Sequence, residues 1–140
     1  MASAAATKQA IMRAFDARDA RYRDEGQTKS GKEHLSMGFN WENARFRIHV
    51  YIDNDGESFH VAAGPVLNVS ASKRDKMMAV VNQANVNYRW CKFYIDGDDD
   101  IMMDGDVEFT GEGDRALQSI FRMADIYDTA YADFMKAQWA

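Results

Sequence analysis

The sequence predicts an α+β fold in which helices cover one face of an antiparallel sheet. In three segments apolar residues recur every three or four positions, which is typical of helices with one buried face. In shorter segments apolar and polar residues alternate, which is typical of strands with one buried and one exposed face. Turn residues separate these segments, so neighbouring strands should run antiparallel. We therefore expect a five-stranded sheet and the element order α-βββ-α-ββ-α.

The first predicted helix covers residues 7–24 and ends before Gly26. The second begins at Ser72 or Lys73, where Ser72 and Asp75 resemble a capping box. The third covers residues 113–137 and should be about 35 Å long. Its distal end carries four large apolar side chains: Tyr131, Phe134, Met135 and Trp139. They either dock on another subunit or close the core of the same chain.

The five predicted strands cover residues 34–39, 44–53, 57–63, 91–95 and 101–108. A tight loop at 53–56 would pair Val50 with Phe59 and place His49 opposite His60. The proline after Gly64 is expected to end the third strand. In the last hairpin, Phe93 should face Met103 in the core, and Lys92 should face Asp104 as an opposite-charge pair.

Composition limits the classes of function. We expect one domain over residues 1–140, because 46% of the residues are hydrophobic and disorder is thereby disfavoured. A net charge of −5 argues against nucleic acid or an anionic membrane as the partner. The single cysteine, Cys91, allows no disulfide within the chain, and no apolar run reaches the roughly 20 residues of a membrane span. A cytoplasmic protein is therefore expected.

Residues 81–103, VNQANVNYRWCKFYIDGDDDIMM, combine an Asn-x-x-Asn helix end, an aromatic strand, an acidic turn and a second strand. This stretch, with the acidic strand and long helix of residues 104–134, resembles the YbjN family, described as bacterial sensory transduction regulators. Ala84 stands where that family often has tryptophan. The resemblance implies a fold like that of type III secretion chaperones. It also implies a homodimer that binds other proteins and has no catalytic residues.

Two groups of side chains could suggest a metal. Asp96, Asp98 and Asp100 match three positions of a calcium-binding EF-hand loop, but Ile101 and Val107 stand where glycine and glutamate are required. His49 and His60 could be two metal ligands, with His34 as a third. A solvated turn and exposed imidazoles are the favoured interpretations. We therefore predict no metal-binding, catalytic or cofactor-binding residues, and no cofactor.

The outward-facing strand residues form a candidate protein-contact surface. Arg45, Arg47 and His49 lie on one strand, and Asp104, Asp106 and Glu108 lie on another. Segregated charges of opposite sign could steer a partner or dock two copies head to tail. A solvated face with weak pairs is the alternative. Tyr131, Phe134 and Trp139 complete the candidate surface.

The predicted function is that of a non-enzymatic protein-binding adaptor, chaperone-like or regulatory domain that acts as a homodimer with an unidentified protein partner. The alternative is a small-molecule-binding protein or enzyme with a pocket between sheet and helices. A structural component of a larger particle is a third alternative. A deep pocket with convergent polar groups would favour the small-molecule alternative, whereas a filled core would favour the adaptor.

Overall fold

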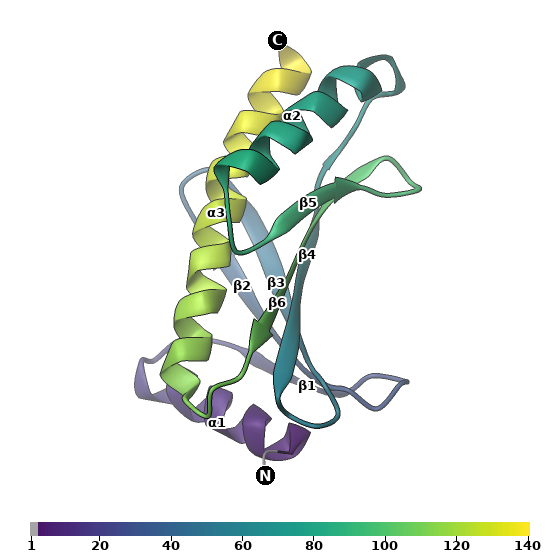
Figure 1. Ribbon diagram of the computed structural model, residues 1–140. Coiled ribbons are helices and arrows are strands. Elements are labelled where there is room, and N and C mark those ends of the chain that lie inside the picture. The colour runs from purple at the N-terminus through teal and green to yellow at the C-terminus, as the bar shows by residue number, and fades with distance from the viewer. Residues whose placement is uncertain (1–2) are drawn as a thin grey trace.

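The computed structural model describes residues 3–140, in which three α-helices pack on one face of a six-stranded antiparallel sheet (Figure 1). The strand order across the sheet is β1-β2-β3-β4-β6-β5, and the order along the chain is α-ββββ-α-ββ-α. The α+β class, the antiparallel pairing and the helices on one face are confirmed. The predicted number of five strands is wrong by one.

The helices are α1 (Ala4–Ala17), α2 (Arg74–Asn87), which follows a short 3₁₀ turn at Ala71–Lys73, and α3 (Gly113–Trp139). The strands are β1 (Arg23–Gln27), β2 (Glu33–Asn40), β3 (Arg45–Ile52), β4 (Ser58–Asn68), β5 (Lys92–Ile95) and β6 (Asp100–Glu108). None of the described helices combines the length and the apolar character that crossing a membrane would require.

The strand that was not predicted is β1, which the sequence pattern placed in the first helix and the following linker. Helix α1 ends at Ala17, and Asp19 then adopts a positive φ of 53° that turns the chain back. Tyr22 looked helical because it follows Phe15 by seven residues. It lies beyond α1, and its ring packs on Phe15 with the ring centroids 5.2 Å apart. All five residues of strand β1 are exposed, so its pairing with β2 defines it.

The register of β3 and β4 differs from the predicted one by two residues. The observed pairs are Ile52 with Phe59, Tyr51 with His60, Val50 with Val61 and His49 with Ala62. The loop is longer than predicted, because the Asp53 amide donates to the carbonyl of Ser58 at 3.0 Å. The predicted placement of His49 opposite His60 is therefore wrong. A displacement of two residues still keeps every apolar side chain on the core face.

Strand β4 also continues past Gly64 and Pro65, which were expected to end it. Its pairing with β6 shifts between Ala63 and Leu67, so the proline lies in an irregularity of the strand, where a missing amide hydrogen is tolerated. The predicted pairs in the β5–β6 hairpin are confirmed: Phe93 lies opposite Met103, and Lys92 lies opposite Asp104.

The space between the sheet and the helices is filled by side chains. The rings of Phe46 on β3 and Tyr127 on α3 stack with centroids 4.0 Å apart. Helices α1 and α3 approach closely at Gly113, where an added Cβ would lie 2.3 Å from the carbonyl oxygen of Ala10. Only glycine fits this contact, so it sets how closely the two helices pack. Because the core is filled, a functional site with polar side chains is expected on the opposite face or at the edges of the sheet.

Helix α2 begins without the predicted capping box. Lys73 occupies the N-cap, no side chain there accepts a hydrogen bond, and Ser72 lies within the preceding 3₁₀ turn. The buried residues Met77, Val81 and Ala84 hold the helix against the core. The start of α2 is therefore set by its packing and by the preceding turn rather than by a serine cap.

Candidate functional site

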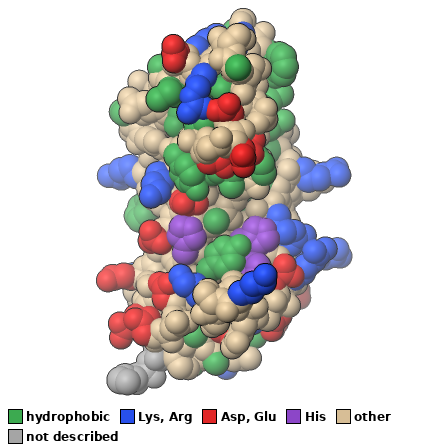
Figure 2. Space-filling model, turned by 90° about the vertical axis from the view of Figure 1, so that its right-hand side faces the viewer, with side chains coloured by type: hydrophobic (Ala, Val, Ile, Leu, Met, Phe, Trp, Pro, Cys, Tyr) green, Lys and Arg blue, Asp and Glu red, His purple; other side chains and the backbone are tan. Residues whose placement is uncertain are grey.

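The sheet face opposite the helices, called the open face, carries polar side chains from β2, β3, β4 and β6. Its main members are His34, Ser36, Arg45, Arg47, His49, Tyr51, His60, Asp104, Asp106 and Glu108. Figure 2 shows this face: histidines gather in its lower half, with acidic side chains toward the left edge and basic ones toward the right. The predicted segregation of charge thus exists, with β4 between the two groups.

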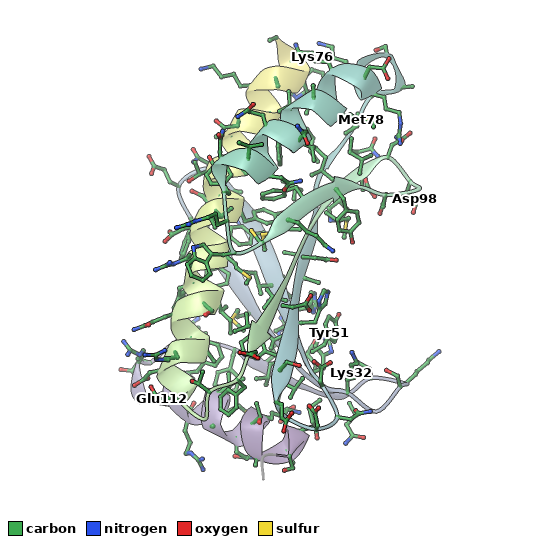
Figure 3. All side chains as sticks on the ribbon, in the orientation of Figure 1. Lys32, Tyr51, Lys76, Met78, Asp98 and Glu112 are labelled. Carbon is green, nitrogen blue, oxygen red and sulfur yellow. The ribbon has the colours of Figure 1, made fainter. Side chains whose placement is uncertain are left out.

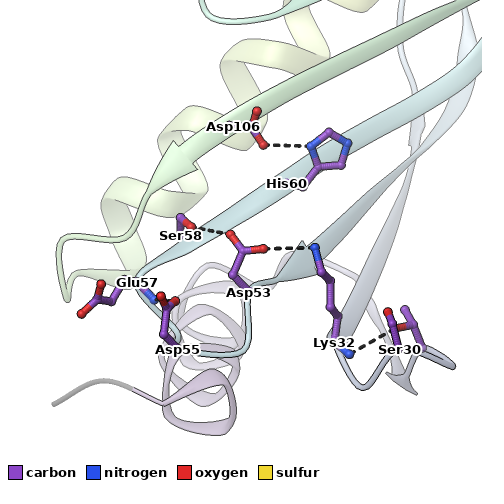
Figure 4. A network of polar contacts seen from close by, with 9 residues as sticks. Ser30, Lys32, Asp53, Asp55, Glu57, Ser58, His60 and Asp106 are labelled. Atoms are coloured by element: carbon purple, nitrogen blue, oxygen red, sulfur yellow. Dashed lines mark hydrogen bonds and ion pairs between the residues drawn. The ribbon is translucent and has the colours of Figure 1, made fainter.

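His60 on β4 joins the acidic side of the open face. Its Nδ1 lies 2.9 Å from an Asp106 carboxylate oxygen (Figure 4). Its Nε2 lies 3.7 Å from an Asp104 carboxylate oxygen. Both partners lie on β6. His60 and Asp106 are directly opposite each other in the β4–β6 ladder, which brings their side chains together. His60 therefore contacts carboxylates and not the other two histidines of the chain.

Below His60, a polar network fixes the turn between β3 and β4. The Asp53 carboxylate accepts a hydrogen bond from the Ser58 hydroxyl and pairs with Lys32, whose Nζ lies 3.1 Å away (Figure 4). The Ser58 hydrogen bond is the largest cause that lowers the pKa of Asp53, and Lys32 lowers it further against the effect of burial. This network ties the β3–β4 turn to Lys32 beside the open face.

His34 and His49 meet on the basic side of the open face. Their Nε2 and Nδ1 atoms lie 2.9 Å apart, and the ring of His34 stacks on Tyr51 with centroids 4.5 Å apart. Tyr51 projects from the sheet on the side away from the helices (Figure 3). Burial is the main cause that lowers the pKa of both histidines. The sequence offered His34 only as a third ligand beside His49 and His60; the β2–β3 pairing brings it to His49, while His60 contacts carboxylates.

A second feature lies at the edge of the sheet, between β6 and α3. This edge groove has a volume of about 390 Å³ and is lined by Trp90, Asp106, Val107, Glu108, Arg115, Gln118, Ser119, Arg122 and Met123. The guanidinium of Arg122 lies over the Trp90 ring, 4.7 Å from its centroid. Helix α3 thus presents a polar stripe toward the groove, with an arginine at each end. The sequence pattern gave no sign of this contact between distant segments.

Along this groove, β6 has no strand partner on its outer side among residues 3–140. Strand β5 pairs with β6 only from Ile101 to Asp104. The Phe109 amide donates to Glu57 on the β4 side, and peptide groups alternate in direction along a strand. The N–H and C=O groups of Asp106 and Glu108 therefore point away from β4, into the groove, where no described strand pairs with them.

The neighbouring edge, that of β5, is closed by a side chain. The Asn85 amide on α2 donates to the carbonyl of Phe93 at 2.9 Å and accepts from the amide of Phe93 at 2.8 Å. The side chain thereby takes the place of one residue of a paired strand. Charged side chains and blocked backbones are common protections for sheet edges, so the uncovered part of β6 differs from the edge beside it.

The distal end of α3 contributes mainly to the core. Phe134 is fully buried against Phe93, with the two rings edge to face and 5.2 Å apart. Tyr131 is half-buried, and Trp139 is 71% exposed. Of the three predicted contact residues on this helix, Trp139 is thus the most accessible, whereas Phe134 closes the core of its own chain and lies away from any surface.

Two buried polar residues were not predicted. Asp128 on α3 accepts hydrogen bonds from the backbone amides of Asn43 and Ala44, at 2.9 and 2.8 Å, and so fixes the β2–β3 turn. Lys8 is 6% exposed and pairs with Asp24 and Glu33, although its helix position suggested an exposed face. Burial lowers the pKa of Lys8, but the hydrogen bonds to both carboxylates outweigh this effect and raise it.

The acidic turn between β5 and β6 is held by its own hydrogen bonds. One Asp96 oxygen accepts from the amides of Asp98 and Asp100, at 2.9 and 3.0 Å. Arg74 pairs with Asp99.

Cys91 is partly buried, and burial raises the pKa of its thiol to about 11. A thiol with that pKa is a poor nucleophile at neutral pH.

Comparison with known proteins identifies the family. The family model for YbjN, described as a "putative bacterial sensory transduction regulator", matches residues 7–133, nearly the whole chain. The chain belongs to the YbjN family. No curated protein and no solved structure matches it. The likeness to secretion chaperones therefore stays a prediction.

The structure gives a physical role to the stretch that resembles YbjN proteins. Ala84 is buried, so its small side chain lets α2 pack closely on the core. Asn85 closes the edge of β5, and the acidic turn sets the β5–β6 pairing. In this member of the YbjN family, the stretch is therefore structural and borders the edge groove.

Proposed function

We propose that this YbjN-family chain is a cytoplasmic, non-enzymatic regulatory domain that binds an extended segment of a partner protein in the edge groove. The observation that carries the proposal is the unpaired backbone of Asp106 and Glu108 beside a groove of about 390 Å³. An extended peptide can add to such an edge through main-chain hydrogen bonds, while side chains around it select the sequence.

The groove favours an acidic segment. Arg115 and Arg122 line it from α3, and Trp90 supplies a flat apolar surface beside them. Guanidinium groups bind carboxylates through paired hydrogen bonds, and aromatic side chains are frequent anchors at protein interfaces. The carboxylates of Asp106 and Glu108 oppose this preference at the strand side, so the acidic partner residues should face α3.

The test is selection from a displayed library of random twelve-residue peptides. We expect enriched peptides with acidic residues at alternate positions. Glu108→Pro removes an amide donor at a position where the strand edge tolerates proline, so it should weaken binding by roughly 10-fold or more. Arg115→Glu with Arg122→Glu should abolish binding. Lys76→Glu makes one such charge reversal on α2, away from the groove, and should leave binding unchanged, whereas Arg115→Glu or Arg122→Glu alone should weaken it (Figure 3).

A small anionic ligand is the second candidate, because the two groove arginines could bind it without any help from the strand edge. Glu108→Pro distinguishes the two candidates. It should weaken the binding of a peptide that pairs with β6, but it should not change the binding of a small anion. Peptide selection that yields no binder, or binders indifferent to both groove variants, would refute the peptide proposal.

The homodimer is supported by the charge pattern of the open face. Arg45 and Arg47 lie on β3, on one side of this face, and Asp104, Asp106 and Glu108 lie on β6, on the other. A second copy turned by a two-fold rotation would bring each basic group onto an acidic one. Arg45→Glu with Arg47→Glu should therefore convert a dimer into a monomer in light scattering. An unchanged mass would refute dimerisation through this face.

A further inference from the structure

Three adjacent strands bring a set of metal-binding side chains together on the open face. Glu25 of β1, His34 of β2 and His49 of β3 each place one donor atom within 4.8 Å of the other two. The His34 Nε2 and His49 Nδ1 atoms are 2.9 Å apart. Two imidazoles and a carboxylate are ligands that first-row transition metals commonly take in proteins.

The local backbone explains why Glu25 reaches the histidines. The β1–β2 register shifts between Asp24 and Gly26. Asp24 pairs with Leu35 and Gly26 pairs with the adjacent His34, which leaves Glu25 without a partner on β2. Glu25 is therefore the extra residue of a β-bulge. A bulge redirects the side chain at its extra position, and here that side chain joins the open face next to His34.

The rings of the two histidines are already positioned. Tyr51 follows His49 by two residues on β3, and its ring stacks on His34 at 4.5 Å and lies 6.1 Å from His49. Both histidines are half-buried. One of the two facing nitrogens carries the proton of their hydrogen bond, so a bound metal would displace that proton.

The distances also indicate the class of ion. A metal about 2.1 Å from both nitrogens would make an N–metal–N angle of roughly 90°, given their present 2.9 Å separation. That angle suits octahedral or square-planar Ni²⁺ and Cu²⁺, and opening the nitrogens to about 3.4 Å would suit tetrahedral Zn²⁺. Calcium and magnesium prefer oxygen ligands and should not compete.

We propose that Glu25, His34 and His49 form a binding site for one divalent transition-metal ion of this class, with water in the remaining positions. The ion would link β1, the exposed edge strand, to its neighbour β2 and to β3 beyond it. Occupancy would therefore stabilise the pairing of β1 and alter the surface of the open face. This proposal does not depend on the edge groove.

The test is calorimetric titration of the full chain, without any histidine tag, with ZnCl₂ and NiCl₂ in a buffer that does not bind metal. We expect one ion per chain and a rise in the midpoint of thermal unfolding with metal concentration. His34→Gln and His49→Gln should each weaken binding by more than roughly 10-fold, and Glu25→Gln by about 10-fold. MgCl₂ should give no binding.

Two matched controls locate the site. His60→Gln removes the remaining histidine of the open face, and Asp98→Asn alters the acidic turn; both should bind metal like the wild type. If wild type binds no ion, or if binding survives His34→Gln or is lost in either control, the proposal is wrong. If a histidine variant fails to fold, NMR spectra of the wild type provide the test. Ni²⁺ should broaden the ring signals of His34 and His49, and unchanged signals would refute the site.

Discussion

Replacing Asn85 with alanine tests how the edge of β5 is protected. The Asn85 amide makes two hydrogen bonds, at 2.9 and 2.8 Å, to the backbone of Phe93. Each should contribute about 1 kcal/mol, so their loss should cost about 2 kcal/mol. Alanine is a better helix former than asparagine by roughly 0.6 kcal/mol. Asn85→Ala should therefore lower the free energy of unfolding by about 1.4 kcal/mol.

The matched control is Asn82→Ala, one turn earlier on the same helix, where the side chain is exposed. This variant gains the same helix propensity without losing a bond to β5, so it should be stabilised by roughly 0.6 kcal/mol. The difference between the two variants isolates the two hydrogen bonds and should be about 2 kcal/mol.

Urea unfolding followed by circular dichroism measures both variants, and equal slopes would show that the unfolded states are comparable. Asn85→Asp keeps the acceptor but loses the donor to the Phe93 carbonyl, so its hydrogen-bond loss should be intermediate. If Asn85→Ala and Asn82→Ala agree within about 0.5 kcal/mol, the amide does not stabilise the edge and the reasoning fails.

Three further predictions follow from burial and charge. Phe134→Ala should lower the free energy of unfolding by about 3–5 kcal/mol because it opens a cavity in the core, whereas Trp139→Ala should change it by less than about 0.5 kcal/mol; urea unfolding compares them. Cys91, with its pKa near 11 instead of 9.0, should react with iodoacetamide at pH 8 roughly 100-fold more slowly than an ordinary cysteine, and unfolding in urea should remove this protection. Because the Ser58 hydroxyl lowers the pKa of Asp53 below 3.8, Asp53 stabilises the fold above that pH, and its advantage over Asp53→Asn should shrink as the pH falls below about 4 in unfolding experiments. A constant advantage down to pH 2 would contradict this account.

The sequence predicted the elements whose local pattern agrees with their tertiary packing. The β5–β6 pairs were correct because a short acidic turn leaves one register that joins Phe93 to Met103. The β3–β4 register was wrong because a period of two cannot distinguish displacements by two residues. Strand β1 carries no apolar pattern, so only its backbone pairing with β2 defines it.

The candidate site was predictable only in part, for a related reason. Alternation placed Arg45, Arg47 and the acidic residues of β6 on the open face. By contrast, the contact between His34 and His49 depends on which strands are neighbours, and the edge groove depends on Arg122 reaching Trp90. Such contacts join residues far apart in the chain, and no local period encodes them.

The position of β4 between β3 and β6 bears on how the chain folds. Strands β1 to β4 pair with their neighbours in sequence, so this meander can form through short loops as soon as it is synthesised. The β4–β6 ladder instead joins His60 to Asp106 across the whole of α2 and β5. Closing a longer loop costs more chain entropy, so we expect this seam to form last. Until it closes, the backbone of β4 has no partner on the edge that β6 later occupies. The half-synthesised chain is therefore the form most prone to aggregation.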